Sequence, residues 1–134
     1  MKKNGFTLVE MLAVVLMIGV LAVITGPMVL KALENARVDS FKRDVEGIVR
    51  TIKTSQDENN FTSETYTITN GVIKRSNGDT LNTKGGSTEN GSAEIDMDGY
   101  IRIAVSKGKW CATKGSKVDK ITVNTNASSC TLPS

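Results

Sequence analysis

Apolar and polar positions divide the chain into two parts with different periods. Residues 6–30 form one apolar run whose only charged side chain is Glu10. As a helix, these 25 residues would measure about 38 Å at about 1.5 Å per residue, against about 30 Å of bilayer hydrocarbon. The run therefore predicts a helix that is long enough to span a membrane.

An amphipathic segment follows, from Lys31 to about Glu58. Its apolar positions recur at alternating spacings of three and four residues, which corresponds to one face of a helix. These positions are Val38, Phe41, Val45, Ile48 and Ile52. We expect the first helix to continue through residues 31–58. Such a stripe is normally buried by the protein's own sheet, and a coiled coil or a filament core is the rival interpretation.

Beyond Asn59 the chain changes to short alternating segments rich in Thr, Asn, Gly and Ser, a texture typical of strands and turns. Asn70-Gly71 is a favoured two-residue hairpin turn, and it separates strand-like residues 66–68 from residues 72–74. Residues 76–92 have the composition of a mobile loop.

A second hairpin is predicted around Asp98-Gly99. The alternating apolar positions on its two sides are Ile95 and Met97 before the turn, then Ile101, Ile103 and Val105 after it. Ile121 and Val123 supply one more strand. The predicted fold is α+β: a long N-terminal helix, transmembrane in its first half, packed on a small antiparallel sheet of about three to five strands in residues 59–134.

The composition indicates one modest domain plus an anchor. Of 134 residues, 39% are hydrophobic, and many of these lie in the apolar run, so the exterior core needs support from other sources. Cys111 and Cys130 supply it most simply as a disulfide that closes a loop of about 20 residues, worth roughly 3 kcal/mol in the chain-entropy model. Without histidine or a C-x-x-C motif, we expect no metal site, cofactor or redox centre.

The flanks of the apolar run set its orientation. Lys2 and Lys3 precede it, so the positive-inside rule places this end in the cytoplasm and the rest of the chain outside. The run ends in residues 24–28, Ile-Thr-Gly-Pro-Met, where we find no good site for an ordinary signal peptidase. Loss of both lysines would lower the net charge of +3 to +1, so bulk charge favours no particular partner.

Glu10 is the candidate functional residue of the apolar run. A carboxylate at the bilayer centre costs about 2.5 to 3.5 kcal/mol on insertion scales, so an acid within a spanning segment is a functional hypothesis by default. The alternative is that Glu10, in the first turn, complements its own helix dipole or reaches the membrane interface, worth about 0.3 to 1 kcal/mol.

The segment Lys3-Asn4-Gly5-Phe6-Thr7-Leu8-Val9-Glu10, followed by the apolar run, resembles the prepilin leader, or class III signal peptide, of type IV pilins and pseudopilins. The likeness covers roughly residues 2–30 and does not extend to the C-terminal domain. It implies a leader of residues 1–5, cleavage between Gly5 and Phe6 by a prepilin peptidase, and N-methylation of Phe6.

The resemblance also bears on assembly. Cleavage would create an α-ammonium group on Phe6, which Glu10 of another subunit could pair with in a bundle of apolar helices. Removing one partner of a buried ion pair can cost about 3 to 5 kcal/mol. Gly19 and Pro27 match the family pattern and bracket the stretch that loosens in assembled pili. In a pilin, the amphipathic stripe packs on the sheet and on neighbouring helices.

Pro27 leaves two structural alternatives open. It has no N–H and its ring crowds the preceding turn, so a continuous helix must kink or open near Gly26-Pro27. Alternatively, Gly26-Pro27 marks the membrane boundary and begins a second helix, because proline is well tolerated in a first turn.

Three other motifs have weaker functional interpretations. Asp96-Met97-Asp98-Gly99 resembles part of a calcium loop, but the further ligand positions are wrong and a hairpin turn is the stronger interpretation. N-glycosylation sequons begin at Asn60, Asn90 and Asn126, and they carry little weight because the leader points to a prokaryote. The third motif is a set of five lysines around Trp110 that could contact DNA or an anionic surface, or simply be solvated: Lys107, Lys109, Lys114, Lys117 and Lys120.

The sequence shows no catalytic constellation, and an enzyme is not expected. The favoured hypothesis is a pilin: a membrane protein that is processed and then assembled into a homo-oligomeric surface filament. Its implied partners are the prepilin peptidase, an assembly ATPase with its platform machinery, and minor pilins. The alternative is a minor pilin or membrane-anchored module that binds DNA or another ligand through the lysines. Adhesion, motility, DNA uptake and secretion stay undecided.

Overall fold

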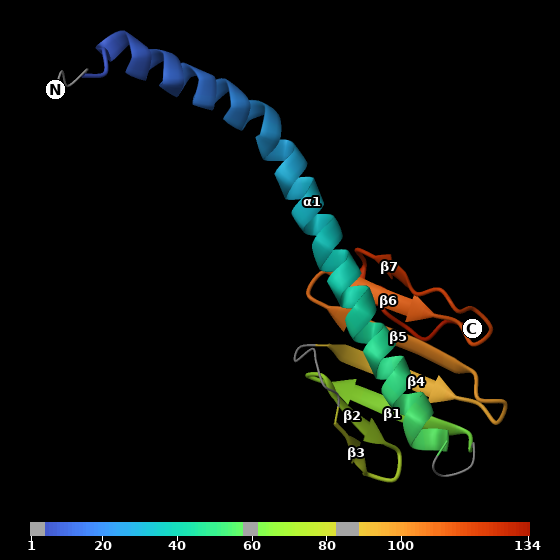
Figure 1. Cartoon of the computed structure of the whole chain (residues 1–134). Coiled ribbons are helices and arrows are strands. Elements are labelled where there is room, and N and C mark those ends of the chain that lie inside the picture. The colour runs from blue at the N-terminus through green and yellow to red at the C-terminus, as the bar shows by residue number, and fades with distance from the viewer. Residues whose placement is uncertain (1–4, 58–61, 83–88) are drawn as a thin grey trace. The chain divides into compact units, whose positions relative to one another are not determined.

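The computed structural model describes residues 5–57, 62–82 and 89–134. The chain divides into two compact units, Met1–Arg37 and Val38–Ser134. One helix, α1, runs from Leu8 to Asp57 and therefore contributes to both units (Figure 1). The described part of the leader is Gly5 alone, and residues 1–4 lie outside the described residues.

The first unit consists of the apolar half of α1. Gly19, Gly26 and Pro27 all lie within α1, which shows no break in its helical assignment at the proline. Just before it, the Thr25 hydroxyl donates a hydrogen bond to the carbonyl of Leu21 at 2.9 Å, a back-bond that often accompanies bending of a helix. Of the two alternatives for Pro27, a continuous helix is therefore the one observed.

The second unit contains a seven-stranded sheet in which every neighbouring pair is antiparallel, in the order β3-β2-β1-β4-β5-β6-β7 (Figure 1). The strand bounds are Glu64–Thr69 (β1), Val72–Arg75 (β2), Thr80–Leu81 (β3), Asn90–Ile95 (β4), Ile101–Lys107 (β5), Trp110–Lys114 (β6) and Thr122–Asn124 (β7). This α+β architecture is the pilin-like arrangement that the sequence predicts.

Both predicted hairpins are confirmed. Asn70 and Gly71 have φ angles of 51° and 75°, the left-handed values that a two-residue turn between β1 and β2 requires. Between β4 and β5, the Asp96 carboxylate accepts hydrogen bonds from the backbone N–H groups of Asp98 at 3.0 Å and Tyr100 at 2.8 Å. This segment is thus a side-chain-stabilised turn, and Met97 lies in the turn instead of extending β4.

The predicted strand count of three to five was too low. β6 was not among the predicted strands, although it pairs along its whole length with β5. The two-residue β3 and the start of β4 fall within the predicted loop 76–92, and residues 83–88 of that loop lie outside the described residues. These segments are strands because they pair with neighbouring strands in the sheet, and a local sequence pattern cannot reveal such pairing.

The core of the second unit lies between α1 and one face of the sheet. The helix stripe is buried at Phe41, Val45, Ile48 and Ile52, and only Val38 at its start is half-buried. Opposite it lie alternate residues of the central strands, including Ile68, Ile95, Ile101, Ile103 and Val105. Full burial of such a side chain is worth about 1.5 to 3 kcal/mol. The chain's own sheet therefore buries the stripe, as the first interpretation predicted.

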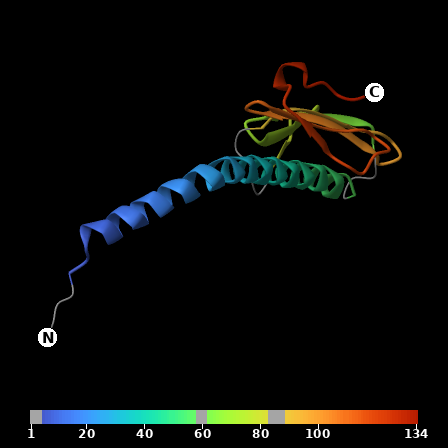
Figure 2. The same ribbon diagram turned by 90° about the horizontal axis from the view of Figure 1, so that it is seen from above.

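The C-terminal segment lies on the other face of the sheet from α1 (Figure 2). It contains the short 3-10 helix η1, Ala127–Ser129, and the predicted disulfide between Cys111 of β6 and Cys130 is present with a Cα–Cα distance of 5.5 Å. The buried Cys111 shows that this segment covers the sheet at β6. The disulfide thus fastens the segment to an interior strand.

Candidate functional site

The N-terminal end of α1 is closed by a reciprocal cap between Thr7 and Glu10. The backbone N–H and hydroxyl of Thr7 donate hydrogen bonds to Oε2 of Glu10 at 3.0 and 3.1 Å, and the Glu10 N–H donates to the Thr7 hydroxyl at 3.4 Å. This is a capping box, which satisfies N–H groups that a helix start leaves unpaired. Sequence analysis missed it, although the spacing T-x-x-E is the signal for it.

In the single chain, Glu10 therefore lies against its own helix start, which agrees with the helix-dipole interpretation of this residue. The carboxylate is exposed, and only Thr7 among the described residues holds it. Because this carboxylate is exposed, it can exchange its hydrogen bonds with Thr7 for a cationic partner without any rearrangement of the helix.

The predicted processing site precedes the helix. Gly5 is exposed and a Cβ added there would meet no atom within 4 Å, while Phe6 is 78% exposed. Because α1 begins at Leu8, the bond between Gly5 and Phe6 lies in non-helical backbone. A peptidase can bind such a segment in an extended conformation without first unwinding a helix.

The apolar half of α1 has no cover of its own. Every large hydrophobic side chain from Leu8 to Leu30 is exposed, on all sides of the helix. Within the described residues, α1 is the one helix that is long and apolar enough to cross a membrane, judged by length and composition. A helix that is apolar all round belongs in lipid or among other helices.

The five lysines predicted to form one surface are dispersed. Lys107 and Lys114 end β5 and β6 on the side of the sheet that faces α1, and Lys117 and Lys120 lie between β6 and β7. Lys109 lies in the turn before β6, with Nζ 5.5 Å from the centre of the Trp110 ring. Trp110 itself packs against the core. A ligand surface formed by these lysines around Trp110 stays a prediction.

Lys107 connects the sheet to α1 through two carboxylates. Its Nζ donates hydrogen bonds to Glu89 at 2.7 Å and Asp44 at 3.0 Å, and it lies 6.0 Å from the centre of the Phe41 ring. The hydrogen bond to Glu89 is the main reason why the pKa of Lys107 is raised, and Asp44 raises it further against the effect of burial. Glu89 is buried, so this lysine neutralises a charge that water cannot reach.

Lys114 is the opposite case. It is only 8% exposed, and its Nζ donates a hydrogen bond to the carbonyl of Ile101 at 3.3 Å. Burial lowers the pKa of Lys114, and the positive charge of Lys53 lowers it further, while Asp119 acts in the other direction. Sequence analysis named Lys114 but had no signal for its burial or for its neighbour on α1.

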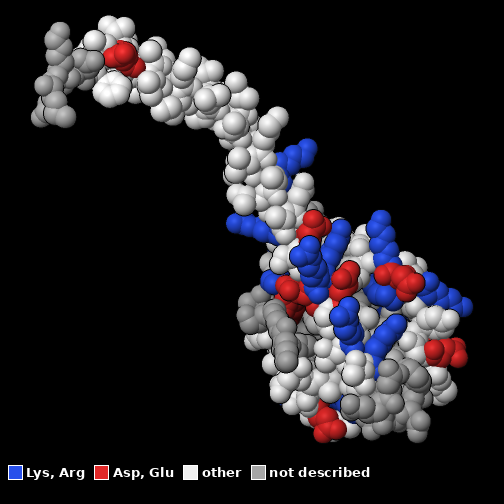
Figure 3. All heavy atoms as spheres, in the orientation of Figure 1, with Lys and Arg blue, Asp and Glu red and all other residues white. Residues whose placement is uncertain are grey.

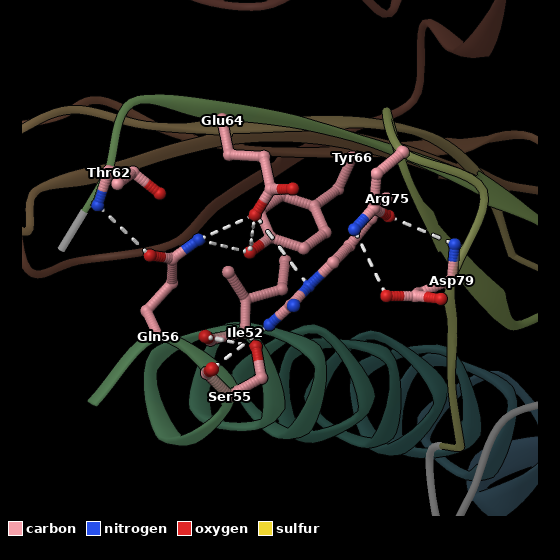
Figure 4. Close-up of polar contacts among 9 residues, drawn as sticks. Ile52, Ser55, Gln56, Thr62, Glu64, Tyr66, Arg75 and Asp79 are labelled. Carbon is pink, nitrogen blue, oxygen red and sulfur yellow. Dashed lines mark hydrogen bonds and ion pairs between the residues drawn. The ribbon is translucent and has the colours of Figure 1, made fainter. Parts of the chain in front are cut away.

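A buried polar cluster joins the C-terminal end of α1 to β1 and β2 (Figure 4). Gln56 donates hydrogen bonds from Nε2 to Glu64 and to the Tyr66 hydroxyl, both at 2.7 Å. The Arg75 guanidinium donates to the Ser55 carbonyl at 3.0 Å, which satisfies an acceptor at the end of the helix. Gln56 follows Ile52 at a spacing of four, and this continuation of the apolar stripe could have predicted its burial.

Across residues 5–57, 62–82 and 89–134, no group of three or more His, Cys, Asp or Glu side chains is placed to hold a metal ion. The N-terminal segment combines non-helical backbone at Gly5, a capped carboxylate at Glu10 and an uncovered apolar helix.

Comparison with known proteins also gives a match in the N-terminal segment. Residues 1–26 match the family model described as the prokaryotic N-terminal methylation motif. Searches of curated proteins and of solved structures returned no match to this chain. The chain thus carries a prokaryotic N-terminal methylation motif, a class III signal peptide typical of type IV pilins and pseudopilins, joined to a pilin-like α+β fold.

Proposed function

We propose that this protein is a structural subunit, a pilin or pseudopilin, of a type IV pilus or a type IV pilus-like filament. Prepilin peptidase would cut it after Gly5, Phe6 would be N-methylated, and an assembly ATPase with its platform proteins would move it from the membrane into the filament. The observation that carries the proposal is the uncovered apolar helix directly behind the methylation motif.

The apolar half of α1 is stable only where lipid or other helices cover it. Each large apolar side chain that leaves water gains about 1.5 to 3 kcal/mol, and those from Leu8 to Leu30 have no cover in the single chain. Lipid provides the cover before assembly, and the helices of other subunits provide it afterwards. A soluble monomer would expose an apolar surface far larger than such proteins tolerate.

Glu10 would select the register of assembly. Cleavage leaves a new α-ammonium at Phe6, four residues before Glu10. The carboxylate can then leave Thr7 to pair with the ammonium of a neighbouring subunit. Within an apolar bundle that pair is shielded from water, so leaving one charge alone would cost about 3 to 5 kcal/mol. The Thr7 cap keeps the carboxylate at the helix start until the partner arrives.

N-terminal sequencing and intact mass of material sheared from the cell surface test the proposal. We expect chains that begin at N-methylated Phe6. A Glu10→Gln variant should be cleaved but absent from sheared filaments, whereas Glu46→Gln, the same change at an exposed position further along α1, should be recovered in them. Uncleaved wild-type chains that remain in the membrane would contradict the proposal.

A further inference from the structure

A hollow beside α1 brings together three cationic side chains from different parts of the sequence. It occupies about 310 Å³ between α1 and the end of β6. Arg50 and Lys53 reach it from the helix, and Lys114 reaches it from the sheet. On this face of the second unit, Lys and Arg side chains lie interspersed with Asp and Glu side chains (Figure 3). We call the three residues the cationic groove.

Within the described residues, some cations of the second unit pair with carboxylates, and the three cations of the groove do not. Among the described residues, ion pairs within 4.0 Å are made by Lys42, Arg75, Arg102 and Lys107. Neither Arg50, Lys53 nor Lys114 makes one within that part of the chain. Glu46 and Asp119 also line the hollow, so its five charged groups together carry a net charge of +1.

The groove holds like charges close together in partly dry surroundings. Lys114 is nearly buried, and its amine donates one hydrogen bond to a carbonyl. The positive charge of Lys53 disfavours the charged form of Lys114. Burial of an ammonium group is unfavourable unless it is paired. An anion placed among the three cations would supply that pairing and relieve the repulsion between the lysines.

We propose that the cationic groove binds a phosphate group. A phosphate offers up to two negative charges and several acceptor oxygens on one compact centre, so it can accept charge-assisted hydrogen bonds from three cations at once. The planar fork of Arg50 suits two of those oxygens, and the lysines act as point charges on the others.

The hollow also has room for the proposed ligand. It is large enough for a phosphate group, either as the free ion or as a phosphodiester of a longer molecule that lies along α1. The inference rests on the fold of the second unit alone and does not depend on filament assembly.

The test is a titration of the full isotopically labelled chain, held in maltoside micelles that contain no phosphate, with inorganic phosphate at constant ionic strength. We expect saturable NMR shifts at the backbone amides of residues 50, 53 and 114, and none with chloride. Arg50→Gln and Lys53→Gln, both at exposed helix positions, should each weaken binding by about tenfold.

Lys74→Gln is the matched control, because it removes the same charge from the exposed side of β2. It should leave the affinity for phosphate unchanged. The proposal is overturned if phosphate gives no saturable shift, or if all three variants behave alike. A short single-stranded DNA oligonucleotide then identifies the source: tighter binding at the same amides than inorganic phosphate indicates a phosphodiester, and no gain indicates the free ion.

Discussion

The hydroxyl of Tyr66 donates a hydrogen bond to Oε2 of Glu64 at 2.9 Å, two residues earlier on the same strand. Residues two apart on a strand share a face, so both side chains of β1 point toward α1. The same carboxylate oxygen accepts from Gln56, which closes a triangle of polar groups at the edge of the core. A triangle of this kind holds the end of the helix to the sheet.

Tyr66→Phe should lower the free energy of unfolding of the domain by about 1 to 2 kcal/mol. The ring still fits, but Gln56 and Glu64 each lose a partner in a buried site. Urea unfolding of the full chain in micelles, followed through the fluorescence of its one tryptophan, Trp110, measures the change. Tyr100→Phe, an exposed tyrosine, should have almost no effect. Equal losses in both variants would contradict the role of the triangle.

Gly91 and Gly47 should respond to alanine with opposite signs. A Cβ at Gly91 would lie 2.8 Å from the Cα of Val105 on the paired strand, so Gly91→Ala must push β4 and β5 apart. We expect a loss of about 3 kcal/mol or more, as for overpacking of a tight core. A Cβ at Gly47, in α1, would meet nothing within 4 Å, so Gly47→Ala should gain about 0.5 to 1 kcal/mol. Thermal unfolding of the two variants checks both signs.

Loss of the disulfide should destabilise the domain by roughly 3 kcal/mol, since the bridge spans 19 residues of sequence. Cys111→Ser, Cys130→Ser and the double variant should unfold at the same urea concentration, because each removes the same bond. A reducing agent should bring the wild type to a similar midpoint. Separation of the three midpoints by more than experimental error would mean that the thiols have roles of their own.

Lys107→Met should destabilise the domain at neutral pH by roughly 2 kcal/mol, somewhat less than for a fully buried pair. The variant leaves Glu89, which is 1% exposed at its side chain, without its counter-charge. Because the pKa of Lys107 is raised by folding, its contribution is complete below the unfolded pKa of about 10.4 and is lost as the pH rises through the higher folded pKa. The difference between wild type and variant should therefore shrink above about pH 10.4. A difference that stays constant above about pH 10.4 would contradict this account.

Lys114→Met should stabilise the domain at neutral pH by roughly 1 kcal/mol, because an apolar side chain of similar length removes a buried charge that lacks an ion pair. The pKa of Lys114 is lowered by folding, so its charge destabilises the fold below the folded pKa, and this effect disappears by the unfolded pKa of about 10.4. The advantage of the variant should fall over the same pH range. A variant less stable than wild type at pH 7 would contradict this account.

The sequence predicts the features that depend on local pattern. The apolar run, the stripe from Phe41 to Ile52 and the turn at Asn70-Gly71 each follow from spacing or from a residue's backbone preference, and each is observed. The disulfide followed from compartment and from there being two cysteines. The T-x-x-E spacing from Thr7 to Glu10 also indicates the observed capping box.

Features that depend on distant partners were not predictable. Lys114 donates a hydrogen bond to the carbonyl of Ile101 on β5, and Lys53 of α1 lies near it. The sequence around residue 114 indicates neither contact. The pairing of Lys107 with Asp44 joins residues 63 apart in sequence. For the same reason β6 was not among the predicted strands: its polar residues fit a strand only when its neighbours β5 and β7 are known.

The attachment of Cys130 to Cys111 also determines how the domain would respond to mechanical load. Edge strands are usually the first to peel away, and β7 is an edge strand with only three residues. A pull on residues 131–134 would enter the sheet through the covalent bond at β6, an interior strand, and bypass β7 and η1. The outermost strand is thereby held at both ends, so unzipping from that edge would have to begin by breaking a covalent bond or by extracting β6 itself.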